Sequence, residues 1–387
     1  MLNNTEEGFA TKAIHAGQDP QQWTHGSVVP PLIMSTTFQK DGPAQHRGYN
    51  YARRGNPSRT YLQTCLAKLE GGKHCFVFPS GMGTVTGLMT LLKAGEHVVC
   101  GTDVYGGTNR FFRECMPNQN IAVTFADACN TRDFMKAVKP NTKMIWIESP
   151  TNPLLRLADI REISQQIKKV RPEIYVAVDN TFATCYFQKP LDLGADIVMY
   201  SLTKFMNGHS DVIMGAAIMR RDDIAKTIQF TQNAMGIIPS PFDCSLVLRS
   251  LKTLEVRMQQ HSKNGLAVAK FLETHPLVTK VVHPFLESHP QHELALKQMS
   301  GHSGMVAFYH KGDSDKFLKS IKVITLADSL GGCESLAGLP SVSSHAMMTE
   351  EERNKLGIND QLIRLSIGLE TEQDLIADLD QALKSSM

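Results

Sequence analysis

Between residues 75 and 219, short apolar runs alternate with stretches of helical periodicity such as Asp159–Val170. The runs are Cys75–Phe78, His97–Cys100, Ile121–Phe125, Met144–Ile147, Ile174–Val178, Ile197–Tyr200 and Val212–Met219. Continuous apolar strands between helices indicate a parallel or mixed sheet that is covered on both faces. The sequence therefore predicts an α/β fold, with ligands at the carboxyl ends of the strands.

The flanking segments differ from this pattern. Residues 1–60 are irregular, and a helix over 58–70, capped by Ser58, is expected to follow them. A long helix is expected from Phe242 to about Thr274. Beyond it, strands at Met305–Phe308, Val323–Leu326 and Ile363–Ile367 alternate with helices near 313–321 and 371–384, which indicates a smaller α+β domain. We therefore expect an arm over 1–60, a large domain over 61–255 and a C-terminal domain over 256–387.

Composition excludes several classes of protein. The chain has 387 residues, with 40 Lys and Arg against 38 Asp and Glu, so its formal net charge is +2. This balance gives no large field of one sign, so capture of nucleic acid or of an anionic membrane is not expected. Eight scattered Cys without a Cys-x-x-Cys pair favour a reducing compartment. The sequence also shows no signal of a secretory leader and no apolar run long enough to span a membrane, so we expect a cytoplasmic protein.

A glycine-containing turn follows the first apolar run. Cys75–Phe78 leads into Ser-Gly-Met-Gly at 80–83, and a helical pattern follows. Backbone N–H groups at a helix start, together with the positive end of the helix dipole, form an anion site. The glycine spacing is one residue off the dinucleotide fingerprint, and the next strand does not end in an acid. We therefore expect a phosphate site, with dinucleotide binding and a plain tight turn as the alternatives.

A lysine and an aspartate follow two other buried strands. Lys204 lies just past Ile197–Tyr200, among hydroxyl and apolar neighbours that suit a desolvated amine able to form a Schiff base. Asp179 follows Ile174–Val178, and beside such a lysine it would keep a pyridinium nitrogen protonated. The plain alternatives are a solvated lysine and a helix-capping aspartate.

Three further positions carry possible chemistry. Tyr105 follows a strand end, where its ring could stack on a flat cofactor and its hydroxyl could transfer a proton. Arg364 stands inside an apolar run and requires an anionic partner, either a substrate carboxylate or a structural acid. His289 and His292 flank a proline without a carboxylate nearby, so we expect a surface loop rather than a metal site.

With these residues placed, the chain resembles the cysteine/methionine-metabolism family of pyridoxal-phosphate enzymes. The resemblance runs from about Ala13 to Leu383, and agreement by chance at eight ordered motifs is negligible. The motifs are YARRGNPSR at 51–59, FPSGMGT at 78–84, DVYGGTNR at 103–110, ESPTNP at 148–153, VDNTF at 178–182, SLTKFMNGHSDVIMG at 201–215, SLGGCESL at 329–336 and IRLSIGLE at 363–370.

This resemblance implies the aspartate-aminotransferase-like fold, with a mostly parallel seven-stranded sheet, and pyridoxal 5'-phosphate as the cofactor. Lys204 would hold the cofactor covalently, Asp179 would pair with its ring nitrogen and Tyr105 would stack on the ring. Residues implied to hold its phosphate are Gly81, Met82, Ser201 and Thr203. Family members are homotetramers built from pairs of active dimers, and Tyr51 and Arg53 match a pair that reaches the phosphate from the neighbouring subunit.

The resemblance also implies the substrate contacts. Ser335, Arg364 and Asn152 match positions that hold the α-carboxylate of an amino acid. Glu334, Arg110 and Asn50 are further candidates for substrate binding. Asn50 stands where many members carry an acid that recognises a distal amine, and Glu334 would compensate for its absence.

Within the family, several details indicate the reaction. Gly107 replaces a cysteine of the methionine-cleaving members, and Leu330 replaces an aromatic residue of the β-cleaving members. The resemblance thus implies γ-elimination of L-cystathionine to L-cysteine, 2-oxobutanoate and ammonia, with release of hydrogen sulfide from cysteine as a side activity. The alternatives are γ-replacement on an activated homoserine, a nicotinamide oxidoreductase and a catalytically inactive binding module.

Overall fold

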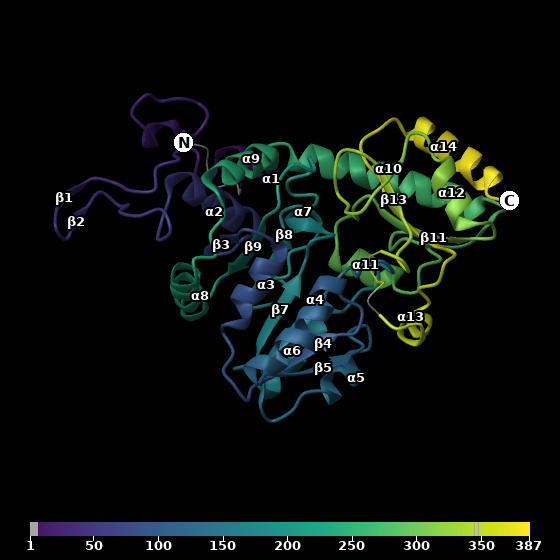
Figure 1. The fold of residues 1–387 in the computed structure, drawn as a ribbon, viewed down its shortest axis with the longest axis horizontal. Helices are drawn as coiled ribbons and strands as arrows, with labels where there is room; N and C mark the ends of the chain where they lie inside the picture. Colours follow the sequence, from purple (N-terminus) through teal and green to yellow (C-terminus); the bar gives the residue numbers. More distant parts are fainter. Residues whose placement is uncertain (1–6, 344, 347) are drawn as a thin grey trace.

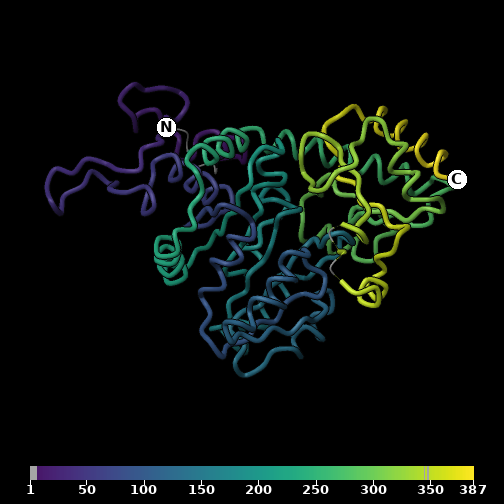
Figure 2. The backbone as a smooth tube through the Cα atoms, in the orientation of Figure 1, coloured from purple at the N-terminus to yellow at the C-terminus, as the bar shows by residue number. Residues whose placement is uncertain are grey.

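The computed structural model describes residues 7–343, 345–346 and 348–387. Its chain forms an N-terminal arm, a large central domain and a smaller C-terminal domain (Figure 1). The arm includes α1 (Phe9–His15) and a small hairpin of β1 (Lys40–Gly42) and β2 (Gln45–His46). Figure 2 shows that this hairpin projects away from the central domain, at the opposite end of the molecule from the C-terminus.

The large domain is built on one seven-stranded sheet. In spatial order the strands are β3 (His74–Phe78), β9 (Gly215–Met219), β8 (Ile197–Ser201), β7 (Tyr175–Asp179), β6 (Thr142–Glu148), β4 (His97–Gly101) and β5 (Ala122–Ala126). Strand β9 pairs antiparallel with β3 and β8, and the other pairs are parallel. The expected mostly parallel α/β sheet is therefore confirmed.

Helices cover both faces of this sheet because alternate strand residues point to opposite sides. Along β8, Val198 and Tyr200 join the core that holds α2, whereas Ile197 and Met199 join the core that holds α3. The helices of this domain are α2 (Pro57–Glu70), α3 (Gly81–Met89), α4 (Gly106–Arg110), α5 (Thr131–Lys136), α6 (Ile160–Val170), α7 (Thr184–Phe187), α8 (Asp222–Met235) and α9 (Pro241–Leu251), with a π-helical turn at Phe111–Cys115 and a 3-10 turn at Pro117–Gln119. A further 3-10 turn, Pro20–Gln22, lies in the arm.

The smaller domain has a five-stranded sheet of its own. Its order is β10 (Val278–Val282), β11 (Met305–His310), β14 (Leu362–Ser366), β13 (Leu336–Gly338) and β12 (Thr325–Leu326). The associated helices are α10 (Leu254–Thr274), α11 (His292–Gln298), α12 (Ser314–Ser320), α13 (Glu350–Leu356) and α14 (Glu372–Ser385). Apolar residues of α10, β11, β14 and α14 form a separate core, as expected for an α+β domain.

Two local expectations are wrong. The single helix expected over 242–274 is two helices. In a continuous helix the carbonyl of Ser250 would accept from the N–H of Leu254, but here it accepts from the guanidinium of Arg257 at 3.0 Å and from the N–H of Thr253 at 3.2 Å. The cap of α2 is Asn56, whose Oδ1 accepts from the N–H of Arg59 at 3.2 Å. Ser58 instead accepts a hydrogen bond from the backbone of the arm.

The boundaries expected between arm and domains both fall inside helices. The boundary after residue 60 lies in α2, and the boundary after residue 255 lies in α10. This division therefore stays a prediction. Within the described part of the chain, no helix has both the length and the apolar content needed to cross a bilayer.

Candidate active site

An unbroken series of contacts joins most of the predicted site residues. It runs along the carboxyl ends of β8, β7 and β6 and crosses to the loop between β12 and β13 of the smaller domain. Within it are Gly81, Ser201, Asp179, Tyr105, Asn152, Arg364 and Lys204. This is the sheet edge where ligands of open α/β folds bind.

The Lys204 amine lies at the junction of the two domains. Its Nζ donates a hydrogen bond to Oγ of Ser329 at 2.7 Å. Burial, together with the positive charge of Arg364, lowers the pKa of Lys204 to about 8. The lower pKa increases the uncharged fraction of this amine near neutral pH, as nucleophilic attack on a carbonyl requires. The alternative of a fully solvated lysine is excluded for the described structure.

Asp179, the last residue of β7, is buried, and only one of its carboxylate oxygens accepts hydrogen bonds within the described chain. Its Oδ1 accepts from the N–H of Thr181 at 3.0 Å and from the hydroxyl of Thr181 at 2.6 Å. Burial raises the pKa of Asp179. Among the described residues Oδ2 accepts no hydrogen bond, so a cationic N–H donor beside it would stabilise the ionised form. A pyridinium nitrogen fits that requirement.

The start of α3 offers donors for an anion. Ser80 caps the helix by accepting from the N–H of Gly83 at 2.8 Å. The N–H groups of Gly81 and Met82 have no acceptor within the described chain. A Cβ on Gly81 would lie 3.2 Å from Oγ of Ser201, so a glycine lets the helix start approach the end of β8 closely. Two amides and a serine hydroxyl next to a positive helix end fit a phosphate group.

Thr203 stands apart from this set. Its hydroxyl donates to the carbonyl of Met214 at 3.2 Å and accepts from the N–H of the same residue at 3.1 Å. Because these bonds tie the loop after β8 to the segment before β9, the hydroxyl already has partners. Its expected contact with the phosphate stays a prediction.

Tyr105 presents an exposed ring at the start of α4, with 47% of its surface accessible. A Cβ on Gly107 would lie 2.5 Å from the Cε1 atom of this ring, so the ring lies directly over a glycine. A larger residue at 107 would displace the ring. The backbone N–H of Tyr105 donates to Oε2 of Glu148 at 2.8 Å.

Arg364 is buried on β14, and within the described part of the chain no acidic side chain forms an ion pair with it. Its Nη1 donates to Oδ1 of Asn152 at 3.2 Å, and its Nη2 donates to the carbonyl of Ser329 at 2.9 Å. Burial lowers the pKa of Arg364 to about 10. In the described chain this guanidinium forms no ion pair, so the alternative of a structural acid is excluded there. A substrate carboxylate would supply the missing charge.

The structure does not bring the hydroxyl of Ser335 into this site. That side chain is fully buried, donates to Oε2 of Glu370 at 2.7 Å and accepts from the N–H of Gly368 at 2.7 Å. Ser329 lies there instead, with its hydroxyl on Lys204 and its carbonyl on Arg364. Its φ of +85°, which non-glycine residues rarely adopt, could not be inferred from the sequence.

Other candidates lie on the outside of the chain. Arg53 places its guanidinium 5.6 Å from the ring centre of Tyr51 and donates to the carbonyl of Asn233 at 3.2 Å. Glu334 and Arg110 are exposed, and Asn50 is half-buried. Within the described chain, no hydrogen bond or ion pair joins any of these candidates to Lys204, Asp179 or Arg364.

His289 lies in an irregular segment with exposed neighbours before α11, as expected of a surface loop, but its own side chain points inward. This side chain is buried and accepts from the N–H of Gln291 through Nδ1 at 3.1 Å. No three His, Cys, Asp or Glu side chains of the described residues converge as a metal-binding group.

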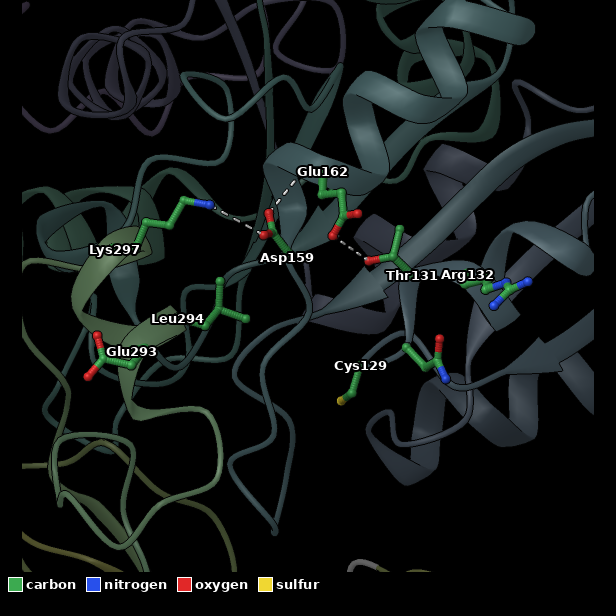
Figure 3. A pocket seen from close by; sticks show the side chains of 9 residues that line it. Cys129, Thr131, Arg132, Asp159, Glu162, Glu293, Leu294 and Lys297 are labelled. Atoms are coloured by element: carbon green, nitrogen blue, oxygen red, sulfur yellow. Dashed lines mark hydrogen bonds and ion pairs between the residues drawn. The ribbon is translucent and has the colours of Figure 1, made fainter.

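A separate hollow of about 660 Å³ lies between α6 and α11 (Figure 3). Several of its polar side chains contact one another: Asp159 lies 3.7 Å from the amine of Lys297, and Thr131 donates to Glu162 at 3.2 Å. None of the predicted site residues lines it.

Comparison with known families shows a match over residues 10–384 to the Cys/Met metabolism PLP-dependent enzymes. Cystathionine gamma-lyase of Mus musculus is 53% identical over 381 residues, covering 98% of this chain and 96% of the relative. A protein named putative cystathionine gamma-lyase 2, from Caenorhabditis elegans, is also 53% identical and covers 97% of each chain.

Solved structures agree with these relatives. Cystathionine gamma-lyase from Lactobacillus plantarum, complexed with L-serine, has a TM-score of 0.95 at 37% identity and covers 98% of this chain and 99% of its own. Cystathionine gamma synthase from Xanthomonas oryzae pv. oryzae, in complex with cystathionine, has a TM-score of 0.95 at 40% identity and covers 99% of both chains.

Proposed function

The chain belongs to the Cys/Met metabolism family of PLP-dependent enzymes, and on this premise we propose that it catalyses γ-elimination of L-cystathionine. The reaction consumes one water and gives L-cysteine, 2-oxobutanoate and ammonia. The observation that carries the proposal is the arrangement of Lys204 and Arg364 on either side of Ser329. It places a nucleophilic amine beside a carboxylate-binding guanidinium, in a chain 53% identical to a cystathionine gamma-lyase.

The cofactor of this enzyme is pyridoxal 5'-phosphate, as in the rest of its family. When bound, it withdraws electrons from the substrate carbon next to the amine and makes the proton on that carbon acidic. Lys204 is the residue that would hold it covalently, and Asp179 would pair with its ring nitrogen. Tyr105 would cover the ring. The amides of Gly81 and Met82 and the hydroxyls of Ser201 and Thr203 would receive the phosphate.

The substrate α-carboxylate would bind Arg364 in the two-pronged geometry that guanidinium groups favour. Asn152 holds one guanidinium nitrogen and the carbonyl of Ser329 holds the other, so both partners orient the group. We assign this supporting role to Ser329 rather than to Ser335, because the hydroxyl of Ser335 is engaged by Glu370.

Proton transfer would fall to Lys204 and Tyr105. With a pKa lowered to about 8, the Nζ atom of Lys204 can take the α-proton and release it again near neutral pH. The exposed hydroxyl of Tyr105 is the second candidate to protonate the departing cysteine sulfur. In its free form the Nζ atom donates to Ser329 at 2.7 Å, which orients the amine toward the site.

Recognition of the distal end of cystathionine involves other residues. Asn50 and Glu334 are the proposed partners of the distal amine, and Arg110 is the proposed partner of the distal carboxylate. Asp328 adds a negative charge near the site. Its charge partly opposes the effect of burial, which lowers the pKa of both Lys204 and Arg364. No sequence pattern singles out Asp328.

We propose a homotetramer made of two active dimers, located in the cytoplasm. Tyr51 and Arg53 would complete the phosphate site of the neighbouring subunit. This assignment is supported by their exposed position on an arm that also exposes the apolar side chains of Val28, Val29 and Met34. A second copy would cover these side chains.

The second candidate function is γ-replacement on an activated homoserine, because the Xanthomonas synthase has the same fold at 40% identity. Purified enzyme should release 2-oxobutanoate from L-cystathionine faster than it forms cystathionine from O-succinylhomoserine and cysteine. Lys204→Ala should abolish both reactions. Faster condensation than cleavage would replace the first proposal with the second.

A further inference from the structure

Glu148 ends strand β6 with both of its carboxylate oxygens bound to backbone. Oε2 accepts from the N–H of Tyr105 at 2.8 Å, and Oε1 accepts from the N–H of Asn152 at 3.2 Å. The side chain is only 7% exposed. One carboxylate thus joins two loops that are more than forty residues apart in the sequence.

The two loops that Glu148 joins carry different parts of the active site. Tyr105 presents the ring proposed to cover the cofactor, and Asn152 accepts the hydrogen bond that orients Arg364. We propose that Glu148 is a positioning residue, which sets the distance between the ring of Tyr105 and the carboxylate-binding pair of Asn152 and Arg364. This role rests on the proposed function, since it concerns how substrate and cofactor are aligned.

The choice of an acid at this position supports the assignment. Glu148 pairs in register with Asp179 on β7, so two buried carboxyl groups stand side by side. Burial and the charge of Asp179 both raise the pKa of Glu148. Two neighbouring buried acids are unfavourable unless something requires them.

The need for two accepting oxygens explains the acid, because each oxygen of Glu148 accepts a hydrogen bond from a different backbone N–H. A glutamine would offer one accepting oxygen and one NH2 group, and the NH2 group would face a backbone N–H with no acceptor between them. A carboxyl group can receive both amides at once. The geometry therefore explains why an acid stands beside Asp179 in spite of its electrostatic cost.

The test compares Glu148→Gln with a matched control in the smaller domain. Asp378 of α14 is likewise buried, and its carboxylate accepts from the backbone N–H groups of Lys322, Val323 and Ile324 at 2.8–2.9 Å. Asp378→Asn weakens the same kind of bond at a residue that, within the described chain, contacts none of the proposed site residues. Both variants, prepared as holoenzymes, are compared by thermal unfolding, steady-state kinetics, cofactor affinity and visible circular dichroism of the bound cofactor.

We expect Glu148→Gln to lower kcat/KM for L-cystathionine by about tenfold to a hundredfold, because small misplacements of reacting groups cost that much. It should also raise KM, weaken cofactor binding and change the visible circular dichroism. Asp378→Asn should lower the unfolding temperature and leave the other three quantities unchanged. If Glu148→Gln fails to fold, Glu148→Asp, which is too short to reach both amides, should show the same losses.

The assignment is overturned if Glu148→Gln, or Glu148→Asp in its place, behaves as Asp378→Asn does, with a lower unfolding temperature and unchanged kinetics, cofactor affinity and circular dichroism. If the wild-type enzyme does not cleave cystathionine, the proposed function fails. Cofactor affinity and circular dichroism still decide the role of Glu148 in that case.

Discussion

Two serines of the loop that faces Lys204 have opposite surroundings. Ser329 is exposed, has a φ of +85° and accepts a hydrogen bond from the lysine amine. Ser335 is fully buried and is held by Glu370 and Gly368. One hydroxyl is therefore free to take part in catalysis, and the other stabilises the loop that carries it.

Replacing each serine by alanine should separate these roles. Ser329→Ala removes the acceptor of the lysine amine, so we expect kcat/KM for L-cystathionine to fall by about tenfold with little change in stability. Ser335→Ala leaves the buried N–H of Gly368 without a partner and should lower the free energy of unfolding by about 1–3 kcal/mol, with little change in kcat/KM. Kinetics and urea unfolding of both variants check this. The reverse assignment would show the reverse pattern.

Single-residue chemistry was predictable from the sequence where a residue ends a buried strand, or where a charge interrupts one as Arg364 does. Lys204 and Asp179 could be predicted because each follows a continuous apolar run. The choice between Ser329 and Ser335 could not, because both lie in one polar loop. It depends on the backbone conformation of Ser329 and on Glu370, which is 35 residues beyond Ser335.

At the scale of elements, the loop between β12 and β13 packs against the loop that follows β8. Gly331 has a φ of +80°, and a Cβ there would lie 2.6 Å from the backbone nitrogen of Phe205 and 3.1 Å from the carbonyl carbon of Lys204. The N–H of Cys333 donates to the carbonyl of Gly208 at 2.9 Å. Close backbone contact between these loops positions Lys204 against Ser329.

Gly331→Ala should therefore displace the Lys204 loop. Gly95→Ala is the matched control, because Gly95 has a φ of +88° but no atom within 4 Å of the position that a Cβ would take. Both variants carry the same backbone strain of order 1–2 kcal/mol. Gly331→Ala should be destabilised further, because its Cβ would also lie too close to the backbone of Phe205. Only Gly331→Ala should also lose most of its activity on L-cystathionine. Equal activity in the two variants would show that the contact does not position the lysine.

Buried histidines of the smaller domain make its stability depend on pH. The rings of His283 and His302 lie 4.9 Å apart, both almost fully buried. Burial lowers the pKa of His302 to about 3 and that of His283 well below its usual value. Both rings therefore stay uncharged in the folded protein at pH values where the unfolded chain takes up protons.

The stability from these neutral rings is fully present above pH 6.5 and is lost as the pH falls toward their folded pKa values. Each histidine should lower the free energy of unfolding by about 2 kcal/mol between pH 6.5 and 5. His302→Phe, which can stack on Phe285 as the imidazole does, removes one such contribution. Denaturant unfolding at both pH values should show a smaller acid loss in this variant. An identical loss would show that His302 is protonated in the folded state.

Elements with a strong apolar pattern were predictable, and short or interrupted ones were not. The expected strands of the large sheet match the observed ones within a few residues, because a buried parallel strand is apolar along its whole length. Strand β13 has only three residues and gives no such pattern. The interruption between α9 and α10 depends on a bond from Arg257, which no local periodicity reveals.

At the scale of the whole molecule, the N-terminal arm is notable for apolar side chains that are exposed to solvent in a single chain. Its hairpin projects from the large domain (Figure 1), and several of its apolar side chains are exposed. The irregular arm was predictable from the sequence, and its packing against a second copy stays a proposal.

Mixing two inactive variants tests whether the arm serves a neighbouring subunit. Arg53→Ala should lose cofactor phosphate binding, and Lys204→Ala should lose the covalent link. In a mixed dimer one site has both residues intact, so about a quarter of the wild-type activity is the most that random mixing can restore. Activity after refolding a mixture, against each variant alone, is the measurement. Hybrid dimers without any activity would place Arg53 in the site of its own subunit.

The central claim is that Lys204 and Arg364 hold L-cystathionine so that its γ carbon–sulfur bond breaks. The most direct measurement is the identity of the products formed by purified holoenzyme from L-cystathionine alone. The account predicts L-cysteine and 2-oxobutanoate in equal amounts, and neither with Lys204→Ala. Homocysteine and pyruvate would show that the β bond breaks instead and would contradict the account.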